Sequence, residues 1–241
     1  MTEIPPVPDT TILLVEVGST AHGTGLPGGE DHDQMGIVVE RPRDVLGLRD
    51  GGLPSVMQRT QLGGLQSGPG DTDRTLHSLR RFLRLAASGN PSILMACWAP
   101  VLQATAEGRE LQAMGDRFIG RHLVARYRGY MQSQARELLA APPLTRTFNT
   151  KRAMHACRLG YQGLELLTTR SLSLPMAGET AGWLRAVRKG EVPLGEWRRE
   201  FERLDASLAA ALTDGTIPEA PDRAAIEAWS IEVHLRLWGA A

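Results

Sequence analysis

The sequence predicts an α+β protein, with a small strand-rich part followed by a mostly helical part. Before about residue 75 the chain carries short apolar runs interspersed with many Gly and Pro residues. After that point apolar residues recur with helical spacing. We therefore expect an N-terminal α/β domain at residues 1–100 and a helical domain at residues 101–241 that packs on it.

The strand predictions come from two continuous apolar runs and one weaker segment. The runs are TILLVEV at residues 11–17 and GIVVE at residues 36–40, which are typical of buried strands. SVMQRT at residues 55–60 is a weaker third strand. These strands are expected to form a small sheet.

The helix predictions begin with TLHSLRRFLRLAASGNP, in which Leu76, Leu79, Leu83 and Ala86 would share one stripe. Arg80, Arg81 and Arg84 lie outside that stripe and are expected to face solvent or line a groove. Asp222 and Thr150 are plausible N-caps for two of the later helices. These later helices are expected near residues 91–98, 116–141, 150–170, 179–189, 194–213 and 222–238.

Composition limits the class of protein. Lys plus Arg and Asp plus Glu each total 27, so the formal net charge is zero and strong non-specific nucleic-acid binding is not expected. No apolar run is long enough to cross a bilayer, and the acidic, Pro-rich start does not resemble a signal peptide. Cys97 and Cys157 suggest reduced core thiols. We therefore expect a cytoplasmic protein with no membrane partner.

The segment VGSTAHGTGLPGGEDHD, at residues 17–33, contains three overlapping signals. Its G-x-G-x-x-G resembles a dinucleotide-binding fingerprint, but Pro27, Gly28 and Gly29 would break the helix that this motif must open. A calcium loop starting at Asp31 fails as well, because Met35 and Pro42 occupy positions that require oxygen ligands. The Gly-Ser pair and the Asp-x-Asp pair remain.

These two pairs are consistent with a phosphate and metal site. A strand ending at Gly18-Ser19 would expose backbone N–H groups and a hydroxyl suited to phosphate. Asp31 and Asp33 are two residues apart, so on a strand both carboxylates would share a face and favour a divalent cation. Asp71 or Asp73 could supply a third carboxylate from a neighbouring strand. Turn or helix capping by these acids is the alternative interpretation.

The pattern resembles the DNA polymerase β superfamily of nucleotidyltransferases, and within it the polymerase-β-like branch associated with RNA repair in bacteria and phages. The matching segments are GSTAHGTGLPGGEDHDQMGIVVE, LHSLRRFLRLAASGNPSIL and KRAMHACRLGYQGLELLTT. Together they cover most of residues 12–170. His32 departs from the family pattern, which has an apolar or aromatic residue there, and we expect it to point away from the metals.

The resemblance implies a palm-like catalytic domain that moves a nucleoside monophosphate from an NTP to an acceptor hydroxyl, releasing pyrophosphate. It implies two Mg²⁺ ions, replaceable by Mn²⁺, held by Asp31, Asp33 and Asp73, with Asp71 as second choice for the third acid. One ion would hold the β- and γ-phosphates and the other would lower the pKa of the acceptor hydroxyl. The triphosphate would lie against Gly18 and Ser19, with His22 nearby.

The segment at residues 150–170 adds a polar helix face. Lys151, His155, Arg158 and Gln162 are spaced i, i+4, i+7 and i+11, so they share one side. Three of these residues could be cationic and none is acidic, which favours phosphate or acceptor binding. A solvated polar face is the alternative.

The sequence does not identify the acceptor, and an RNA end, a protein hydroxyl and a small molecule all remain open. The preferred NTP and the oligomeric state are open as well. Two other functions use the same residues. One is a non-catalytic, antitoxin-like nucleotide-binding protein, and the other is a metal-dependent phosphohydrolase with water as acceptor.

Overall fold

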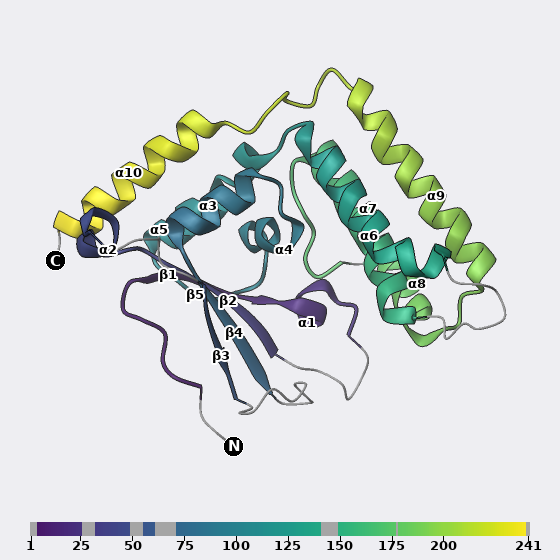
Figure 1. Ribbon diagram of the computed structural model, residues 1–241, viewed down its shortest axis with the longest axis horizontal. Coiled ribbons are helices and arrows are strands. Elements are labelled where there is room, and N and C mark those ends of the chain that lie inside the picture. The colour runs from purple at the N-terminus through teal and green to yellow at the C-terminus, as the bar shows by residue number, and fades with distance from the viewer. Residues whose placement is uncertain are drawn as a thin grey trace.

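The computed structural model describes residues 4–25, 32–48, 55–60, 71–140, 149–176 and 178–239. In Figure 1, α3, α4 and α5 lie above the sheet, α6 to α9 lie to its right, and the N-terminal segment runs down its left side. The N-terminal segment contacts the sheet where Arg74 donates a hydrogen bond of 2.7 Å to the carbonyl oxygen of Pro5. The arrangement confirms the predicted α+β class, with a small sheet followed by a helical C-terminal region.

The sheet has five strands in the order β3-β4-β2-β1-β5. β2 and β4 run parallel, while the other neighbouring pairs are antiparallel, so the sheet is mixed. β1 and β2 contribute to the hydrophobic core, since Leu13 and Val15 of β1 and Ile37 of β2 are fully buried. The strands are β1 (Thr11–Val17), β2 (His32–Val38), β3 (Val56–Arg59), β4 (Thr72–Ser78) and β5 (Val101–Ala104).

The helices account for most of the chain. They are α1 (Gly18–His22), α2 (Pro42–Leu46), α3 (Leu79–Ala87), α4 (Pro91–Leu94), α5 (Ala106–Ala113), α6 (His122–Ala140), α7 (Thr150–Thr169), α8 (Gly178–Lys189), α9 (Leu194–Ala210) and α10 (Arg223–Gly239). Short 3₁₀ turns follow α4, α5 and α9. No helix among the described residues is long and apolar enough to span a membrane.

Several predicted boundaries were wrong. Residue 76 lies on β4, and the helix begins only at Leu79, because residues 72–78 pair with β2 on one side and residues 73–76 with β3 on the other. β2 begins at His32, four residues before the predicted start. The cap of α7 is Asn149 rather than Thr150, since the Asn149 side chain accepts the N–H of Arg152 at 3.1 Å.

The predictions for one helix cap and for the two cysteines were right, whereas some elements were not predicted. Asp222 does cap α10, because its carboxylate accepts the N–H of Ala225 at 3.0 Å. Cys97 and Cys157 are buried and unbridged, as expected for core thiols. The sequence did not predict the helices α1, α2 and α5 or the edge strand β5.

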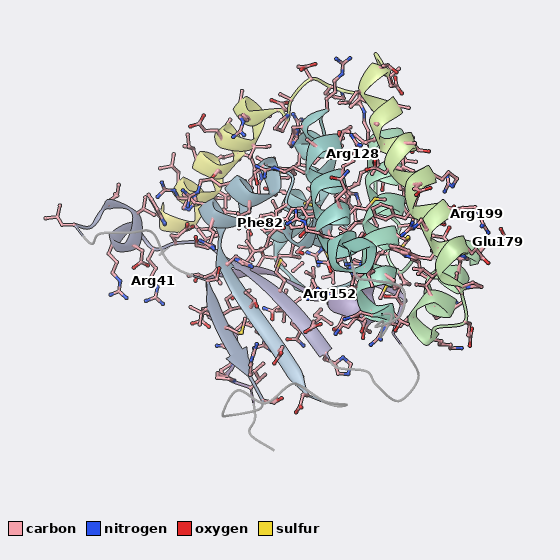
Figure 2. All side chains as sticks on the ribbon, turned by 45° about the vertical axis from the view of Figure 1, so that its right-hand side comes forward. Arg41, Phe82, Arg128, Arg152, Glu179 and Arg199 are labelled. Atoms are coloured by element: carbon pink, nitrogen blue, oxygen red, sulfur yellow. The ribbon has the colours of Figure 1, made fainter. Side chains whose placement is uncertain are left out.

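The core continues from the sheet into the helices. Phe82 of α3, which Figure 2 labels in the interior, is fully buried, as are Tyr127 of α6 and Trp197 of α9. α7 packs against α6, α8 and α9, while α10 returns to lie along α3 (Figure 1). The division at residue 100 stays a prediction, and both β5 and α10 contact elements that precede it.

Candidate functional site

A cavity of about 570 Å³ lies between α1, β2, α4 and α7. Residues more than a hundred positions apart in the chain meet here, with contributions from the sheet and from the long helices. The sequence-predicted site residues that line it are Gly18, Ser19, His22, Asp33, Lys151, His155 and Arg158. The cavity therefore brings both ends of the segment at residues 17–33, the Gly-Ser pair and Asp33, together with the polar face of α7.

The acidic side of the site is set by strand register. Asp33 on β2 lies directly opposite Asp73 on the parallel strand β4, so the two side chains share a face of the sheet. Asp33 lines the cavity, whereas Asp73 does not and instead forms an ion pair of 3.6 Å with Arg59. Asp31, the other acid of the predicted pair, lies outside the described residues.

Asp71 is placed differently from Asp73. Its carboxylate accepts a hydrogen bond of 3.1 Å from the hydroxyl of Thr60, and its carbonyl oxygen accepts the N–H of His32 at 2.9 Å. It thus helps to align the beginnings of β2 and β4. Asp73, rather than Asp71, is the residue in register with Asp33.

Gly18 and Ser19 form the start of α1 rather than the turn that the sequence suggested. Gly18 has a φ of +70°, which favours glycine, and a Cβ at this position would lie only 2.8 Å from Cβ of Asp33. The chain can therefore pass closely over Asp33 only without a side chain at position 18. Ser19 follows immediately and lines the cavity.

His22, at the other end of α1, is buried and makes polar contacts with α7. Its Nε2 contacts an NH group of Arg158, and its Nδ1 lies 3.0 Å from the side-chain amide of Gln162. Because a guanidinium only donates hydrogen bonds, Nε2 must act as the acceptor there. Burial, reinforced by the charge of Arg158 and by His155, holds the pKa of His22 well below its ordinary value.

Arg158 is the central cation of the site. It also contacts Nδ1 of His155 at 3.2 Å, and burial lowers its pKa to about 10, so it remains charged at neutral pH. His155 is held neutral, because burial and the nearby Arg158, Lys151 and Arg188 lower its pKa to about 3. At neutral pH His155 therefore adds no positive charge to the site.

Arg188 supplies the cation that the sequence reading missed. It comes from the last turn of α8 and lines the cavity together with Lys151 and Arg158. Among the described lining residues the one carboxylate is Asp33, so these three cations outnumber the acids. Such an excess suits a ligand with several negative charges. The helical spacing of α8 could not show that Arg188 reaches this cavity, because only the packing of α8 on α7 brings it there.

His32 points away from the cavity, as its position next to Asp33 on a strand predicts. Its ring Nδ1 lies 3.3 Å from a carboxylate oxygen of Glu16, on the opposite face of the sheet. The departure from the family pattern at this residue therefore does not reach the site.

The helical region also holds the end of α1 through its backbone. The N–H of Met176 donates to the carbonyl oxygen of His22 at 3.2 Å, and Arg185 of α8 donates to that of Gly23 at 2.8 Å. α1 is thus fixed to the sheet at its beginning and to the helices at its end.

No three His, Cys, Asp or Glu side chains within the described residues gather in a cluster that could hold a metal ion. Asp31 is not part of that set.

Comparisons with known proteins gave a family match and a similar solved structure. Residues 6–214 match the family model described as RlaP, the RNA repair pathway DNA polymerase beta family. Among solved structures, the chain is similar to a nucleotidyltransferase-like protein from Exiguobacterium sibiricum, with 11% identity and a TM-score of 0.31. That likeness covers 85% of this chain and 69% of the other. No curated protein matches.

Proposed function

Because the chain belongs to the RNA repair pathway DNA polymerase beta family, a nucleotidyltransferase family, we propose that it transfers a nucleoside monophosphate from an NTP to an acceptor hydroxyl and releases pyrophosphate. The observation that carries this proposal is one cavity lined by Asp33 from the sheet and by Lys151, Arg158 and Arg188 from the helices. Nucleotidyl transfer needs both features, a metal-binding acidic side and a cationic side for the phosphates.

The cations would bind and orient the triphosphate. Lys151 is an exposed point charge, whereas Arg158 is held in place by His22 and His155 and presents a planar guanidinium. A positioned guanidinium can donate two parallel hydrogen bonds to a phosphate. Gly18 would let the phosphate chain approach the backbone of α1, with the hydroxyl of Ser19 available to donate a hydrogen bond.

The acids fit a divalent cation by the chemistry of their donor set. Asp33 and Asp73 present carboxylate oxygens, the ligands that Mg²⁺ prefers, from adjacent strands and on one face of the sheet. Together with Asp31 they would hold the metal, Mg²⁺ or Mn²⁺. When bound, the metal would neutralise charge on the phosphates and lower the pKa of the acceptor hydroxyl. Asp73, and not Asp71, is in register with Asp33, which supports Asp73 as the third acid.

The test is to follow the label of α-³²P-labelled NTPs after incubation with the protein and Mg²⁺ or Mn²⁺. Short RNAs with defined ends, a protein extract and small hydroxyl compounds are supplied as separate acceptors. We expect label on one acceptor class together with released pyrophosphate, and no transfer by Asp33→Asn. Asp116→Asn, an exposed acid on the turn after α5, is the matched control.

Other outcomes of this experiment would contradict the proposal. Release of free nucleotide without labelled acceptor would indicate a phosphohydrolase instead. Binding of NTP with neither transfer nor hydrolysis would indicate a nucleotide-binding regulatory protein. Full transfer by Asp33→Asn would show that the acidic side has been assigned wrongly.

A further inference from the structure

A second hollow, of about 500 Å³, lies between α3 and α10 and shares no lining residue with the cavity described above. We call it the α3–α10 groove. Its floor is aliphatic, with Leu83 and Ala87 from α3 and Ile226 from α10. Val45 of α2 lines it as well, and Figure 1 shows α2 beside the C-terminal end of α10.

α10 carries apolar side chains on its outward side as well as on its packed side. Val233 is fully buried against the core, yet Ile231 and Leu235, both lining the groove, are 55% and 62% exposed. These two residues are four apart and therefore form one stripe on the helix. A surface helix is normally polar on its outward side, so an apolar stripe there favours a surface that a partner covers.

Exposed Leu and Ile side chains scattered singly need no explanation. Ile231 and Leu235, however, line a groove whose other apolar lining residues include Val45 of α2 and Leu83 of α3.

Three arginines border this apolar floor. Arg80 and Arg84 come from α3 and Arg223 from the first turn of α10, and all three are exposed. Within the described part of the chain no carboxylate forms an ion pair with any of them. Among the described residues that line the groove, the one acid is Glu227. The groove therefore combines a net positive border with an aliphatic floor.

The groove is held in shape by contacts beneath it. His234 of α10 is buried and lies 3.2 Å from a carboxylate oxygen of Glu40, which precedes α2. Trp238 donates a hydrogen bond of 2.8 Å to the carbonyl oxygen of Glu40, and Arg236 pairs with Glu110 at 3.0 Å. A preformed groove lets a partner bind without ordering α10 at the same time.

We propose that the α3–α10 groove binds an acidic amphipathic helix of a partner protein. Its apolar side chains, spaced i, i+3/i+4 and i+7, would lie on Leu83, Ile231 and Leu235, and its acidic side chains would face the three arginines. Charge complementarity is the argument for this occupant. A second copy of the chain would bring a like-charged groove, and like charges in contact disfavour association.

The side-chain types also favour a protein over RNA. Single-stranded RNA is held by bases that stack on aromatic rings, whereas the apolar part of this lining is mainly aliphatic. Its two aromatic side chains, His234 and Trp238, pack edge to face against each other and hydrogen-bond Glu40.

The test uses the full chain and three fluorescent 16-residue peptides, measured by fluorescence anisotropy. The first peptide carries Leu on one helical stripe and Glu elsewhere, the second has Lys in place of Glu, and the third scrambles the Leu positions of the first. We expect the wild-type protein to bind the first peptide at least about tenfold more tightly than either of the others, because both charge and stripe contribute.

Variants of the protein distinguish binding in this groove from non-specific electrostatic attraction of the peptides. Arg84→Glu/Arg223→Glu should reverse the preference in favour of the Lys peptide. Ile231→Ser/Leu235→Ser should weaken the binding of both the Glu peptide and the Lys peptide. Arg198→Glu/Arg199→Glu is the matched control, since both residues are exposed on α9, where Figure 2 labels Arg199 at the outer surface. Circular dichroism and thermal melting check that each variant folds.

Several results would overturn the proposal. One is equal binding of the Glu, Lys and scrambled peptides, and another is Glu-peptide binding that the groove variants leave unchanged. A third is a dimer in sedimentation that Ile231→Ser/Leu235→Ser dissociates, which would make a second copy the occupant. A fourth is a labelled RNA oligonucleotide that binds and loses affinity in Arg84→Glu/Arg223→Glu while the Glu peptide does not bind.

Discussion

The two sides of the cavity are built in different ways. On the sheet side, Asp33 and Asp73 lie together because β2 and β4 pair in register, and backbone hydrogen bonds of the sheet fix their spacing. On the helix side, Arg158 is positioned by contacts with side chains, His22 and His155, and Arg188 arrives from another helix. The acidic side should therefore tolerate side-chain changes without moving, whereas the cationic side should respond to changes in residues that never touch the nucleotide.

The largest expected effect is on the sheet side. Asp33→Asn should lower nucleotidyl transfer on the order of 10³-fold, since a metal ligand supports several kcal/mol of transition-state stabilisation. The melting temperature should change little, because Asp33 lines an open cavity. Initial rates with α-labelled NTP and a melting curve measure both quantities, and Asp116→Asn should retain wild-type activity. Unfolding of Asp33→Asn would contradict the view that strand pairing alone fixes the acidic side of the cavity.

The second effect is on the helix side. Arg158→Gln should raise the dissociation constant or KM for the NTP about 10–100-fold, because a charge-assisted hydrogen bond contributes about 1.5–3 kcal/mol. Arg198→Gln, an exposed arginine of α9, serves as the matched control. Titration with a non-hydrolysable NTP measures the change. Unaltered affinity would show that Lys151 and Arg188 hold the phosphates without Arg158.

A smaller effect should reveal that His22 acts through Arg158. His22→Ala should weaken NTP affinity about fivefold, as expected for one neutral hydrogen bond of about 1 kcal/mol. In the Arg158→Gln background the same change should add no further loss, and His22→Gln should restore part of the affinity. Additive losses in this double-mutant cycle would mean that His22 contacts the nucleotide itself.

The last prediction concerns the pH dependence of stability, which does not involve the nucleotide. The pKa of His155 is about 3 in the folded protein against an ordinary value of 6.5, so below pH 6.5 the unfolded chain binds a proton that the folded chain does not. Stability therefore falls as the pH drops through this window, by about 1.4 kcal/mol for this residue at pH 5.5. The drop in melting temperature between pH 7.5 and 5.5 should be about 3–5 °C smaller in His155→Gln. An equal drop in both proteins would mean that His155 is accessible to protons.

The sequence predicted the parts of this site that depend on local periodicity. The i, i+4, i+7 spacing placed Lys151, His155 and Arg158 on one face, and alternation along a strand placed His32 away from Asp33. The helix prediction was wrong at residue 76. Leu76 continues the apolar spacing of the α3 stripe, but it pairs with β2 and belongs to β4. The sequence also did not indicate the charge state of His155, which depends on burial and on Arg188, a residue contributed by tertiary packing.

α1 also fixes the number of residues that the chain can have between Gly18 and His22. Gly18 passes over Asp33 and His22 contacts Arg158, so the acidic and cationic sides are joined by four residues of helix, a rise of about 6 Å. Inserting or deleting one residue between them would turn His22 by about 100° around the helix axis and away from α7. Relatives that keep this site can therefore differ freely in the length of their surface loops, but they must agree on the length of this segment.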